Sequence, residues 1–482
     1  MARAWRASEE RASGCPRPER PAEPAAGLVA CVDFGSTFTK ALLVDTTTGD
    51  LLAAADHRTT VDTDVLDGWA ACRAELSATD PRAAQAPVLA CSSAGGGLRV
   101  AVVGNEALVT AEAGRRVALS SGGRVVHVAS GGLDADGLAA LAADRPDVVL
   151  LVGGTDGGNE EVLLACAAAL AGQPWPVVVA GNLDARAQVA TLLEGGGTPY
   201  VLADNVVPRI GVLAPAGARA AIREMFLAHV IGGKQLSASG DFAAMVRGAT
   251  PDVVLTAVEL LARETGDVVV VDVGGATTDV HSVVEPDPED GAGLSRQVVA
   301  AVPVSRTVEG DLGMRWSAVP TVEEGVAAGL VEDGERLRAA AAVRRDDPAY
   351  LPSGDVDARD DELIATAAVG VALRRHAGRS QVVYDAGGRV VERSGKDLRE
   401  VDLLVGSGGV LRHGTPGTAQ RVLGAVTGDV AGGWQLPRAP YVVVDRDYVL
   451  AAAGLLAADH PEAARALLRR LRGPAGGRAA LA

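Results

Sequence analysis

Residues 29–45 read VACVDFGSTFTKALLVD, and residues 268–284 read VVVVDVGGATTDVHSVV. Each segment is an apolar run that ends in Asp-x-Gly, followed by small and hydroxyl residues and then by a second apolar run. One Asp-x-Gly turn is a weak signal, because this is common turn chemistry. Two matched copies predict two β-hairpin turns that hold one phosphate group between two related halves of the chain.

The predicted turns carry the chemical groups that bind phosphate and a divalent metal. Successive backbone N–H groups and hydroxyls can cradle phosphate oxygens, and a turn carboxylate can hold a metal, usually through water. We therefore expect Asp33 and Asp272 to bind the metal. The other expected binding residues are Gly35, Ser36, Thr37 and Lys40 in the first segment and Gly274, Gly275, Thr277, Thr278 and Asp279 in the second.

The composition bounds the class of protein. With 48% hydrophobic and 22% charged residues it is ordinary for a globular protein, and 482 residues predict two or more domains. The net charge of −16, with no basic block, argues against a nucleic-acid partner, which needs a positive surface. No apolar run reaches about 18 residues, so we expect no transmembrane helix and no membrane partner.

The cysteines favour a reducing, cytoplasmic location. They are scattered, odd in number and never spaced as C-x-x-C, which excludes a recognisable zinc or iron–sulfur site. The five are Cys15, Cys31, Cys72, Cys91 and Cys166. The N-terminal segment has basic residues but no apolar stretch, so it does not resemble a secretory signal.

The order of apolar runs and turns predicts four parts. Residues 1–27, rich in Pro, Arg, Glu and Ala, are expected to be a disordered extension. Residues 28–265 would form an N-terminal lobe, with a βα-rich insertion at about 88–205 where short Val-rich strands alternate with Gly-rich turns or helices. Residues 266–458 would form a C-terminal lobe, and 459–482 a helix and tail.

Three other features bear on function. Only three of the 45 basic residues are lysines, Lys40, Lys234 and Lys396, which indicates mutational bias. Lys40, just past the first turn, is then either a point charge that the site needs or a solvated lysine at a strand end. In the insertion, Asp156 and Asn159 stand where a helix N-cap is expected, in either an anion site or an ordinary tight turn. Thr250-Pro251 is expected to cap a helix that runs into the second apolar segment.

The motifs occur in an order that resembles the actin-like ATPase superfamily of sugar kinases, Hsp70 and actin. More closely, the chain resembles the MutL family of the glutamate mutase cluster, which is unrelated to the mismatch-repair protein of that name. The resemblance covers about residues 28–472. It is carried by DFGSTFTK, CSSAGGGLRVAVVG, GGTDGGNEE, VDVGGATTDVHS, RTVEGDLGMR, GSGGVL and DRDYVLAAAGLLA.

The resemblance implies an α/β, actin-like (ribonuclease H-like) fold with two lobes around a nucleotide cleft. ATP and Mg²⁺ would bind there, and Glu309 and Asp311 would orient the attacking water as catalytic groups beside Asp272. The expected adenosine-facing residues are Gly406, Ser407, Gly408 and Gly409. The implied function is that of a chaperone-like accessory ATPase that reactivates an adenosylcobalamin-dependent mutase of the glutamate (methylaspartate) mutase type, with homodimerisation as one option.

The sequence departs from the family pattern in two places. The extension at 1–27 has no counterpart that we can place. Ala249-Thr250-Pro251 stands where a Pro-Thr-Pro-like turn is expected, which weakens the predicted cap.

Several alternatives differ in chemistry. A small-molecule kinase of the same fold would use Asp156 or Asp311 as general base, and an actin-type assembly protein stays open. A cobalamin lower ligand at His281 is rejected, because D-x-H-x-x-G would need glycine where Val284 stands. An iron–sulfur dehydratase activator is excluded by the cysteines, and neither a P-loop nor a Rossmann fingerprint is present.

Overall fold

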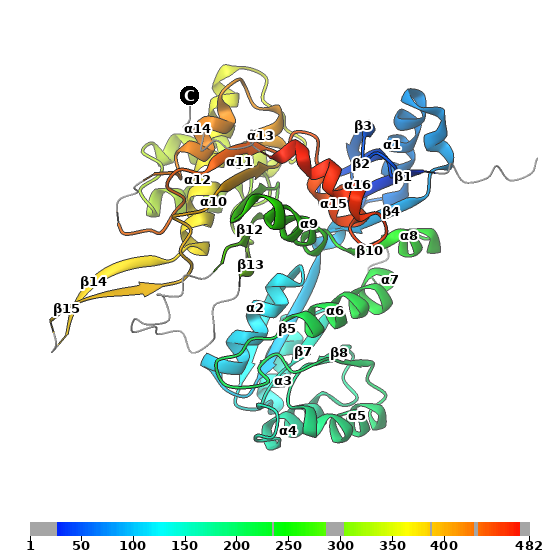
Figure 1. Cartoon of the computed structure of the whole chain (residues 1–482), viewed down its shortest axis with the longest axis vertical. Helices are drawn as coiled ribbons and strands as arrows, with labels where there is room; N and C mark the ends of the chain where they lie inside the picture. The colour runs from blue at the N-terminus through cyan, green and yellow to red at the C-terminus, as the bar shows by residue number, and fades with distance from the viewer. Residues whose placement is uncertain (1–26, 234–235, 286–302, 386–387, 429–431, 473–482) are drawn as a thin grey trace, which may run out of the picture.

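The computed structural model describes residues 27–472, apart from 234–235, 286–302, 386–387 and 429–431. Lys234, the last ten residues and all but the final residue of the expected N-terminal extension therefore lie outside the described residues. Figure 1 shows two neighbouring lobes above a third body, which is formed by the cyan and green part of the chain.

The first lobe is built on a five-stranded sheet of order β10-β4-β1-β2-β3. β1 pairs antiparallel with β2 and parallel with β4, so the predicted hairpin forms the centre of the sheet. The strands are β1 (Leu28–Phe34), β2 (Phe38–Asp45), β3 (Leu51–Arg58), β4 (Val88–Ser92) and β10 (Val246–Ala249). Helix α1 (Val65–Thr79) packs on β2 and β3.

The second lobe repeats this sheet strand for strand, in the order β17-β16-β11-β12-β13. β11 again pairs antiparallel with its hairpin partner β12 and parallel with β16. The strands are β11 (Val268–Val273), β12 (Thr278–Val283), β13 (Val304–Glu309), β16 (Leu403–Ser407) and β17 (Tyr441–Val444). The prediction of two related halves in an actin-like α/β fold is confirmed by this duplicated topology.

Short and long helices complete the second lobe. The helices are α10 (Ala318–Ala327), α11 (Gly334–Asp346), α12 (Asp355–His376), α13 (Gly409–His413) and α14 (Thr418–Gly424). A two-stranded hairpin, β14 (Arg379–Asp385) and β15 (Gly388–Ser394), projects from the lobe in Figure 1.

Two helices lie between the sheets and join the lobes. α9 (Thr250–Thr265) follows β10, and α15 (Val449–Leu456) follows β17, so they are equivalent elements of the two halves. They share one apolar core with the inner faces of both sheets and with α16 (Pro461–Leu468). Figure 1 shows them between the blue first sheet and the second sheet. The small residues of α15 allow this, because its Gly454 lies directly against the backbone of α9.

The third body is the βα-rich insertion, with an all-parallel sheet of order β6-β5-β7-β8-β9. β4, with which the expected insertion at 88–205 begins, pairs with β1, so the separate sheet starts at Leu98. Its strands are β5 (Leu98–Gly104), β6 (Gly123–Ser130), β7 (Val148–Leu151), β8 (Val177–Val179) and β9 (Tyr200–Leu202). Its helices are α2 (Glu112–Ser120), α3 (Ala135–Ala143), α4 (Glu161–Leu170), α5 (Arg186–Gly195) and α6 (Ala216–Met225), and α7 (Ile231–Gly233) and α8 (Gly240–Met245) lead back to β10.

The contact between α9 and α15 gives a first prediction. A Cβ added at Gly454 would lie 2.0 Å from the carbonyl oxygen of Val253, so Gly454→Ala must push the helices apart. We expect a loss of about 1–3 kcal/mol of stability, the usual range for overpacking, seen as a lower Tm by calorimetry. Gly195→Ala is the matched control, since a Cβ at this helical glycine meets nothing within 4 Å. Equal Tm values for the two variants would contradict the close contact.

Candidate phosphate-binding site between the lobes

The two hairpin turns have the same backbone geometry. The amide of Gly35 donates to the carbonyl of Phe38 at 3.1 Å, and the amide of Gly274 donates to that of Thr277 at 2.9 Å. A Cβ on either glycine would lie within 3 Å of the same carbonyl oxygen, at 2.6 Å for Gly35 and 2.9 Å for Gly274. The glycine of each Asp-x-Gly is therefore needed to close its turn.

The turns face each other across the lobe interface. A Cβ on Gly275 would lie 3.0 Å from the hydroxyl oxygen of Thr37. Among the described residues, the buried hydroxyl of Thr37 has no hydrogen-bond partner. The amides of Ser36, Thr37, Gly275 and Ala276 likewise donate to no acceptor in the described part of the chain. A buried hydroxyl is nearly always paired, so the Thr37 hydroxyl, with the open amides beside it, fits an anionic ligand that the turns hold between them.

Asp33 lies at the centre of a polar cluster behind the first turn. It is 7% exposed, accepts a hydrogen bond of 2.6 Å from the Thr250 hydroxyl and forms an ion pair of 3.5 Å with Lys40. The thiol of Cys91, on the neighbouring strand, points to the same carboxylate at 3.6 Å. The predicted cap at Thr250 is wrong, because Ala249 occupies the N-cap position of α9 and the Thr250 hydroxyl is used for Asp33 instead.

Lys40 is held as a cation between the lobes. Its Nζ lies 4.1 Å from the ring centroid of Tyr448, at the start of α15. Burial acts to lower the pKa of Lys40, but Tyr448, Asp33 and Asp272 together outweigh it and raise the pKa above its usual value. The guanidinium of Arg412 lies 4.0 Å from the same ring centroid, so the ring joins a cation of each lobe. Tyr448 takes a left-handed backbone conformation with φ of 57°, which is uncommon for a residue with a side chain.

Asp272 occupies the place of Asp33 in the second lobe. It pairs in register with Asp279 across the hairpin and with Ser407 on the parallel strand. Burial raises the pKa of Asp272; Asp279 adds to the rise, while Lys40 and a hydrogen bond from Ser407 act against it. Asp445, one strand further, is 1% exposed and accepts hydrogen bonds from the first amides of α15. Burial raises the pKa of Asp445 to about 6.

The remaining expected residues of the second turn are placed differently. Thr278 pairs with Val273, whose side chain lies in the outer core of the second lobe, so the Thr278 hydroxyl lies on that face and not toward the site. Asp279 accepts hydrogen bonds from Thr277 at 3.3 Å and Arg306 at 2.7 Å. The second amino group of Arg306 donates to the carbonyl of Leu119 in the insertion at 2.9 Å. Asp279 is therefore part of an ion pair that joins the turn to the insertion.

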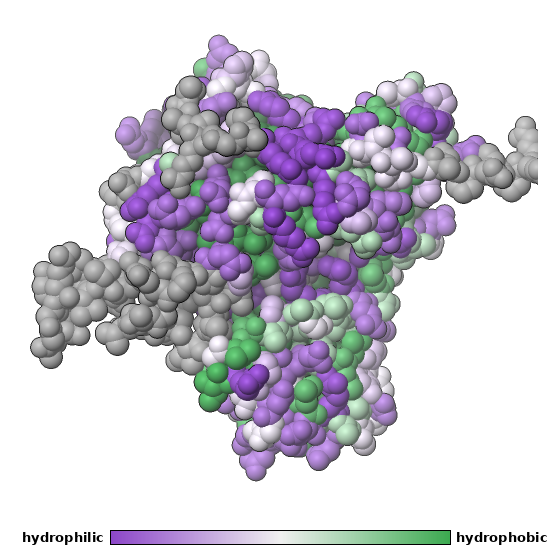
Figure 2. Space-filling model, viewed as in Figure 1, coloured by the Kyte–Doolittle hydropathy of each residue, from purple (hydrophilic) through white to green (hydrophobic). Residues whose placement is uncertain are grey.

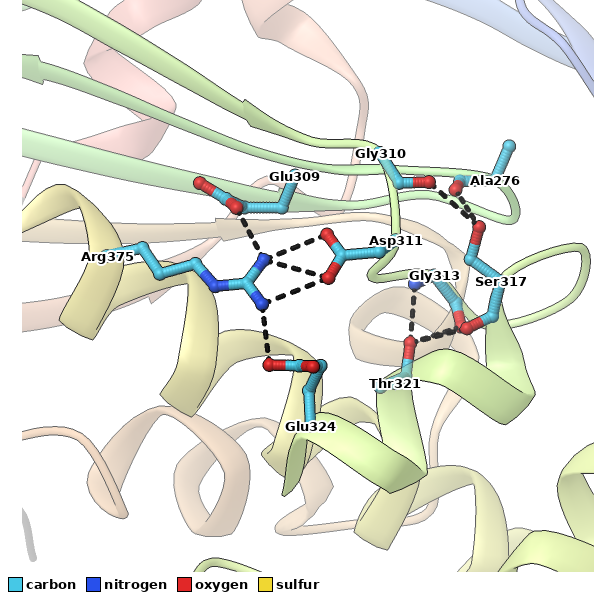
Figure 3. A network of polar contacts seen from close by, with 9 residues as sticks. All are labelled: Ala276, Glu309, Gly310, Asp311, Gly313, Ser317, Thr321, Glu324 and Arg375. Carbon is cyan, nitrogen blue, oxygen red and sulfur yellow. Dashed lines mark hydrogen bonds and ion pairs between the residues drawn. The ribbon is translucent and has the colours of Figure 1, made fainter. Parts of the chain in front are cut away.

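Glu309 and Asp311, expected to orient water, are both bound to Arg375 of α12. Figure 3 shows the guanidinium between these carboxylates and that of Glu324, with contacts of 2.8 Å to Glu309 and Asp311 and 2.7 Å to Glu324. Burial raises the pKa of Glu309, although Arg375 acts against it.

The loop that follows Glu309 is nevertheless attached to the second turn. The Ser317 hydroxyl donates to the carbonyls of Ala276 at 2.7 Å and Gly310 at 3.1 Å, as Figure 3 also shows. Glu309 and Asp311 therefore belong to the segment that supports the second turn. Their expected role in orienting the attacking water stays a prediction.

The expected adenosine segment has one open position. A Cβ on Gly406 would lie 2.7 Å from a leucine side chain, and one on Gly408, with φ of 111°, would lie 2.2 Å from a carbonyl oxygen of β11. A Cβ on Gly409 would meet nothing within 4 Å. Gly406 and Gly408 are therefore explained by packing, and Ser407 by its bond to Asp272. The expected contact with adenosine stays a prediction.

The described residues also test four other expectations: a metal cluster, a membrane helix, a cobalamin ligand at His281 and a general base at Asp156. They contain no group of three or more His, Cys, Asp or Glu side chains that could hold a metal ion by itself. Among them, no helix is both long enough and apolar enough to cross a membrane. His281 is a buried residue of β12, and burial lowers its pKa well below the usual value. Asp156 lies in the insertion, where it accepts from the amide of Leu183 and the side chain of Asn205.

A cavity of about 360 Å³ opens beside the edge strand β17. It is lined by Asp445 together with residues of α14 and of the chain after α16, and none of the segment 406–409 lines it.

Sequence reasoning did not single out Thr250, Arg412, Asp445 and Tyr448 as site residues. The segment DRDYV could have indicated two of them, Asp445 and Tyr448. It connects β17 to the small-residue helix α15, just as Ala249-Thr250 connects β10 to α9 in the first half.

The duplicated sheets, the interlobe helices and the facing turns define a two-lobed protein of the actin-like fold with a candidate phosphate site between its lobes. Residues 29–471 match the model of the MutL protein family, and the chain belongs to this family. Protein MutL of Clostridium tetanomorphum is 35% identical over 458 residues, which cover 91% of this chain and 98% of that protein.

Solved structures are more distant. The nucleotide-free structure of an acetone carboxylase, from work on ATP-dependent acetone carboxylation, is 16% identical with a TM-score of 0.41, covering 90% of this chain and 70% of that one. The activator of the 2-hydroxyisocaproyl-CoA dehydratase from Clostridium difficile, with bound ADPNP, is 10% identical with a TM-score of 0.32, covering 93% and 100%.

A second prediction concerns acid stability and His376. This histidine is buried under β12 and β13, where its ring nitrogens contact the hydroxyls of Ser282 at 2.8 Å and Thr307 at 3.0 Å. Burial, and then the charge of Lys396, lower the pKa of His376 to about 3 from 6.5. A depressed pKa means stability that is present above pH 6.5 and is lost as pH falls toward 3, at up to about 1.4 kcal/mol per pH unit. Denaturant titrations between pH 7 and 4 should show a shallower loss in His376→Gln than in wild type, and equal slopes would contradict this.

Proposed function

We propose that this protein binds ATP with Mg²⁺ between the two hairpin turns and hydrolyses it as an accessory ATPase of an adenosylcobalamin-dependent mutase of the glutamate mutase type. One observation carries the nucleotide part: two turns of the same geometry face each other, and the Thr37 hydroxyl and the amides of Ser36, Thr37, Gly275 and Ala276 have no acceptor in the described chain. Such paired donors fit the β- and γ-phosphates of a nucleotide better than a single anion.

The residues divide the work as follows. The amides of Ser36, Thr37, Gly275 and Ala276 would take phosphate oxygens, and Lys40 supplies a fixed positive charge. Asp33 and Asp272 would hold Mg²⁺ through water, because the described site offers too few carboxylates to ligate it alone. When bound, the metal neutralises charge that develops on the transferred phosphoryl group.

The same residues connect the nucleotide site to lobe movement. Thr250, which begins α9, is bonded to Asp33, and Tyr448, which precedes α15, lies on Lys40. A ligand that draws Asp33 or Lys40 toward phosphate or metal therefore acts on the first residues of both interlobe helices. This supports a protein whose output is a change in lobe arrangement.

The identity of the client enzyme is the more specific half of the proposal. It is supported by the membership of this chain in the MutL family. The kinase alternative has less support, because Asp311 is bound to Arg375 and Asp156 is bound within the insertion.

A third prediction tests the two carboxylates. Calorimetry should detect ATP binding that is stronger with Mg²⁺, and no binding at millimolar nucleotide would end the proposal. Asp272→Asn and Asp33→Asn should each reduce hydrolysis on the order of a hundred-fold, because a charge is removed next to the metal and phosphates. Asparagine is the better test than alanine at position 33, since it still accepts from Thr250. Asp184→Asn, on the insertion surface, is the control and should hydrolyse ATP at the wild-type rate.

A fourth prediction tests the client. ADP production should rise when the adenosylcobalamin-dependent mutase of the same organism is added, and the inactivated mutase should recover activity only with ATP present. Linkage requires that the partner and the nucleotide change each other's affinity equally, commonly by about 1–3 kcal/mol. The comparison is a panel of hydroxylated and carboxylated metabolites. A phosphorylated metabolite, together with no response to the mutase, would decide for a kinase.

A further inference from the structure

The asparagines of this chain have an unusual distribution. The 482 residues contain four of them, and all four lie in the insertion: Asn105, Asn159, Asn182 and Asn205. Asn105 directly follows β5, and the others lie in the loops that follow β7, β8 and β9. Because these strands are parallel, all four loops lie at the carboxyl edge of one sheet. In a chain that uses asparagine nowhere else, this placement indicates that the shape of this edge is needed.

The asparagine side chains fix the loops to one another. Asn205 donates to the carbonyl of Gly154 at 3.0 Å and to the carboxylate of Asp156 at 2.8 Å, while Asn182 donates to the carbonyl of Gly158 at 3.1 Å. Both asparagines are buried. The loop after β7 is thereby held by the loops after β8 and β9, so the three present one rigid surface.

This edge is where a sheet of this topology offers a site. The order β6-β5-β7-β8-β9 reverses between β5 and β7, and ligands of open parallel sheets bind at the carboxyl ends near such a switch point. The opposite edge is already used: Gly122, before β6, lies against Asp252 of α9, and Leu119, in α2, is bonded to Arg306. Among the described residues, the hydrogen bonds of the carboxyl-edge loops go to other residues of the insertion.

The rim of the edge is apolar and acidic. Ile210 is 79% exposed, Val212 43% and Leu183 39%, and the segments that carry them flank Asp156, which bonds the amide of Leu183 and donates its own amide to Pro208. Figure 2 shows apolar patches on the third body among polar residues. The loops at 105–106, 131–134, 152–161, 180–184 and 203–214 contain one base, Arg209, and the acids Glu106, Asp134, Asp156, Glu160, Glu161, Asp184 and Asp204.

We propose that this carboxyl edge is the docking face for the client protein, through a client surface on which basic residues surround an apolar patch. The proposal rests on the proposed function for the client's identity. Three exposed aliphatic side chains on rigid loops supply contact area, and the acidic rim complements a basic partner. A phosphorylated small molecule is disfavoured, since the loops carry one base among seven acids.

Surface variants test the docking face without touching the nucleotide site. Ile210→Asp/Val212→Asp should keep the basal ATPase rate and raise the mutase concentration for half-maximal stimulation about ten-fold or more. Leu351→Asp/Val356→Asp is the matched control, because these aliphatic residues are 70% and 71% exposed and belong to the second lobe, Leu351 just before α12 and Val356 in its first turn. Asp184→Lys should weaken the response as well, and added salt should weaken it in wild type.

The outcomes separate the two proposals. Wild-type ATPase that does not respond to the mutase refutes the client, and with it the docking of that client. A wild-type response that Ile210→Asp/Val212→Asp leaves unchanged refutes the docking face alone. Equal losses in the Leu351→Asp/Val356→Asp control also refute it. Calorimetry with adenosylcobalamin alone covers the small-molecule alternative: binding that these aspartates abolish would assign the edge to a ligand and overturn protein docking.

Discussion

The approach of α9 and α15, at the point where Gly454 meets the carbonyl of Val253, is the constraint on which the rest of the structure depends. It sets the separation of the two sheets, whose inner faces share one apolar core with these helices. That separation brings Thr37 of one turn next to Gly275 of the other. With a larger residue at 454 the sheets could still form, because each has its own outer core, but the turns would no longer meet.

Charge decides what can bind between the turns. Asp33 and Asp272 stand close to Lys40, and Asp279 is held by Arg306, so the fixed cations are already matched by carboxylates. A polyphosphate entering alone would meet these acids with few free positive groups. Backbone amides reduce this repulsion only in part, which gives a physical reason for a divalent cation to accompany any polyphosphate that binds there.

The sequence was sufficient for features that depend on neighbouring residues. Apolar runs around Asp-x-Gly predicted both hairpins, and their repetition predicted the duplicated fold. Contacts between distant segments could not be predicted: Thr250 meets Asp33 across 217 positions, and Arg375 reaches Glu309 across 66. The start of the insertion was missed for a similar reason, because an apolar strand such as β4 reads alike whichever sheet it joins.

The two edges of the insertion's sheet differ in their contacts. Its amino edge is attached to the second turn through the chain Leu119–Arg306–Asp279, in which the arginine side chain is 2% exposed and both contacts are under 3 Å. Within the described part of the chain, the loops of its carboxyl edge bond only to the insertion itself, and asparagine side chains hold three of them together. The insertion would rotate as one rigid α/β body between its carboxyl and amino edges, because parallel strands and packed helices resist bending far more than loops do. A partner that binds at the carboxyl edge and rotates the insertion would therefore displace Arg306. That displacement would move Asp279 and, with it, the second turn.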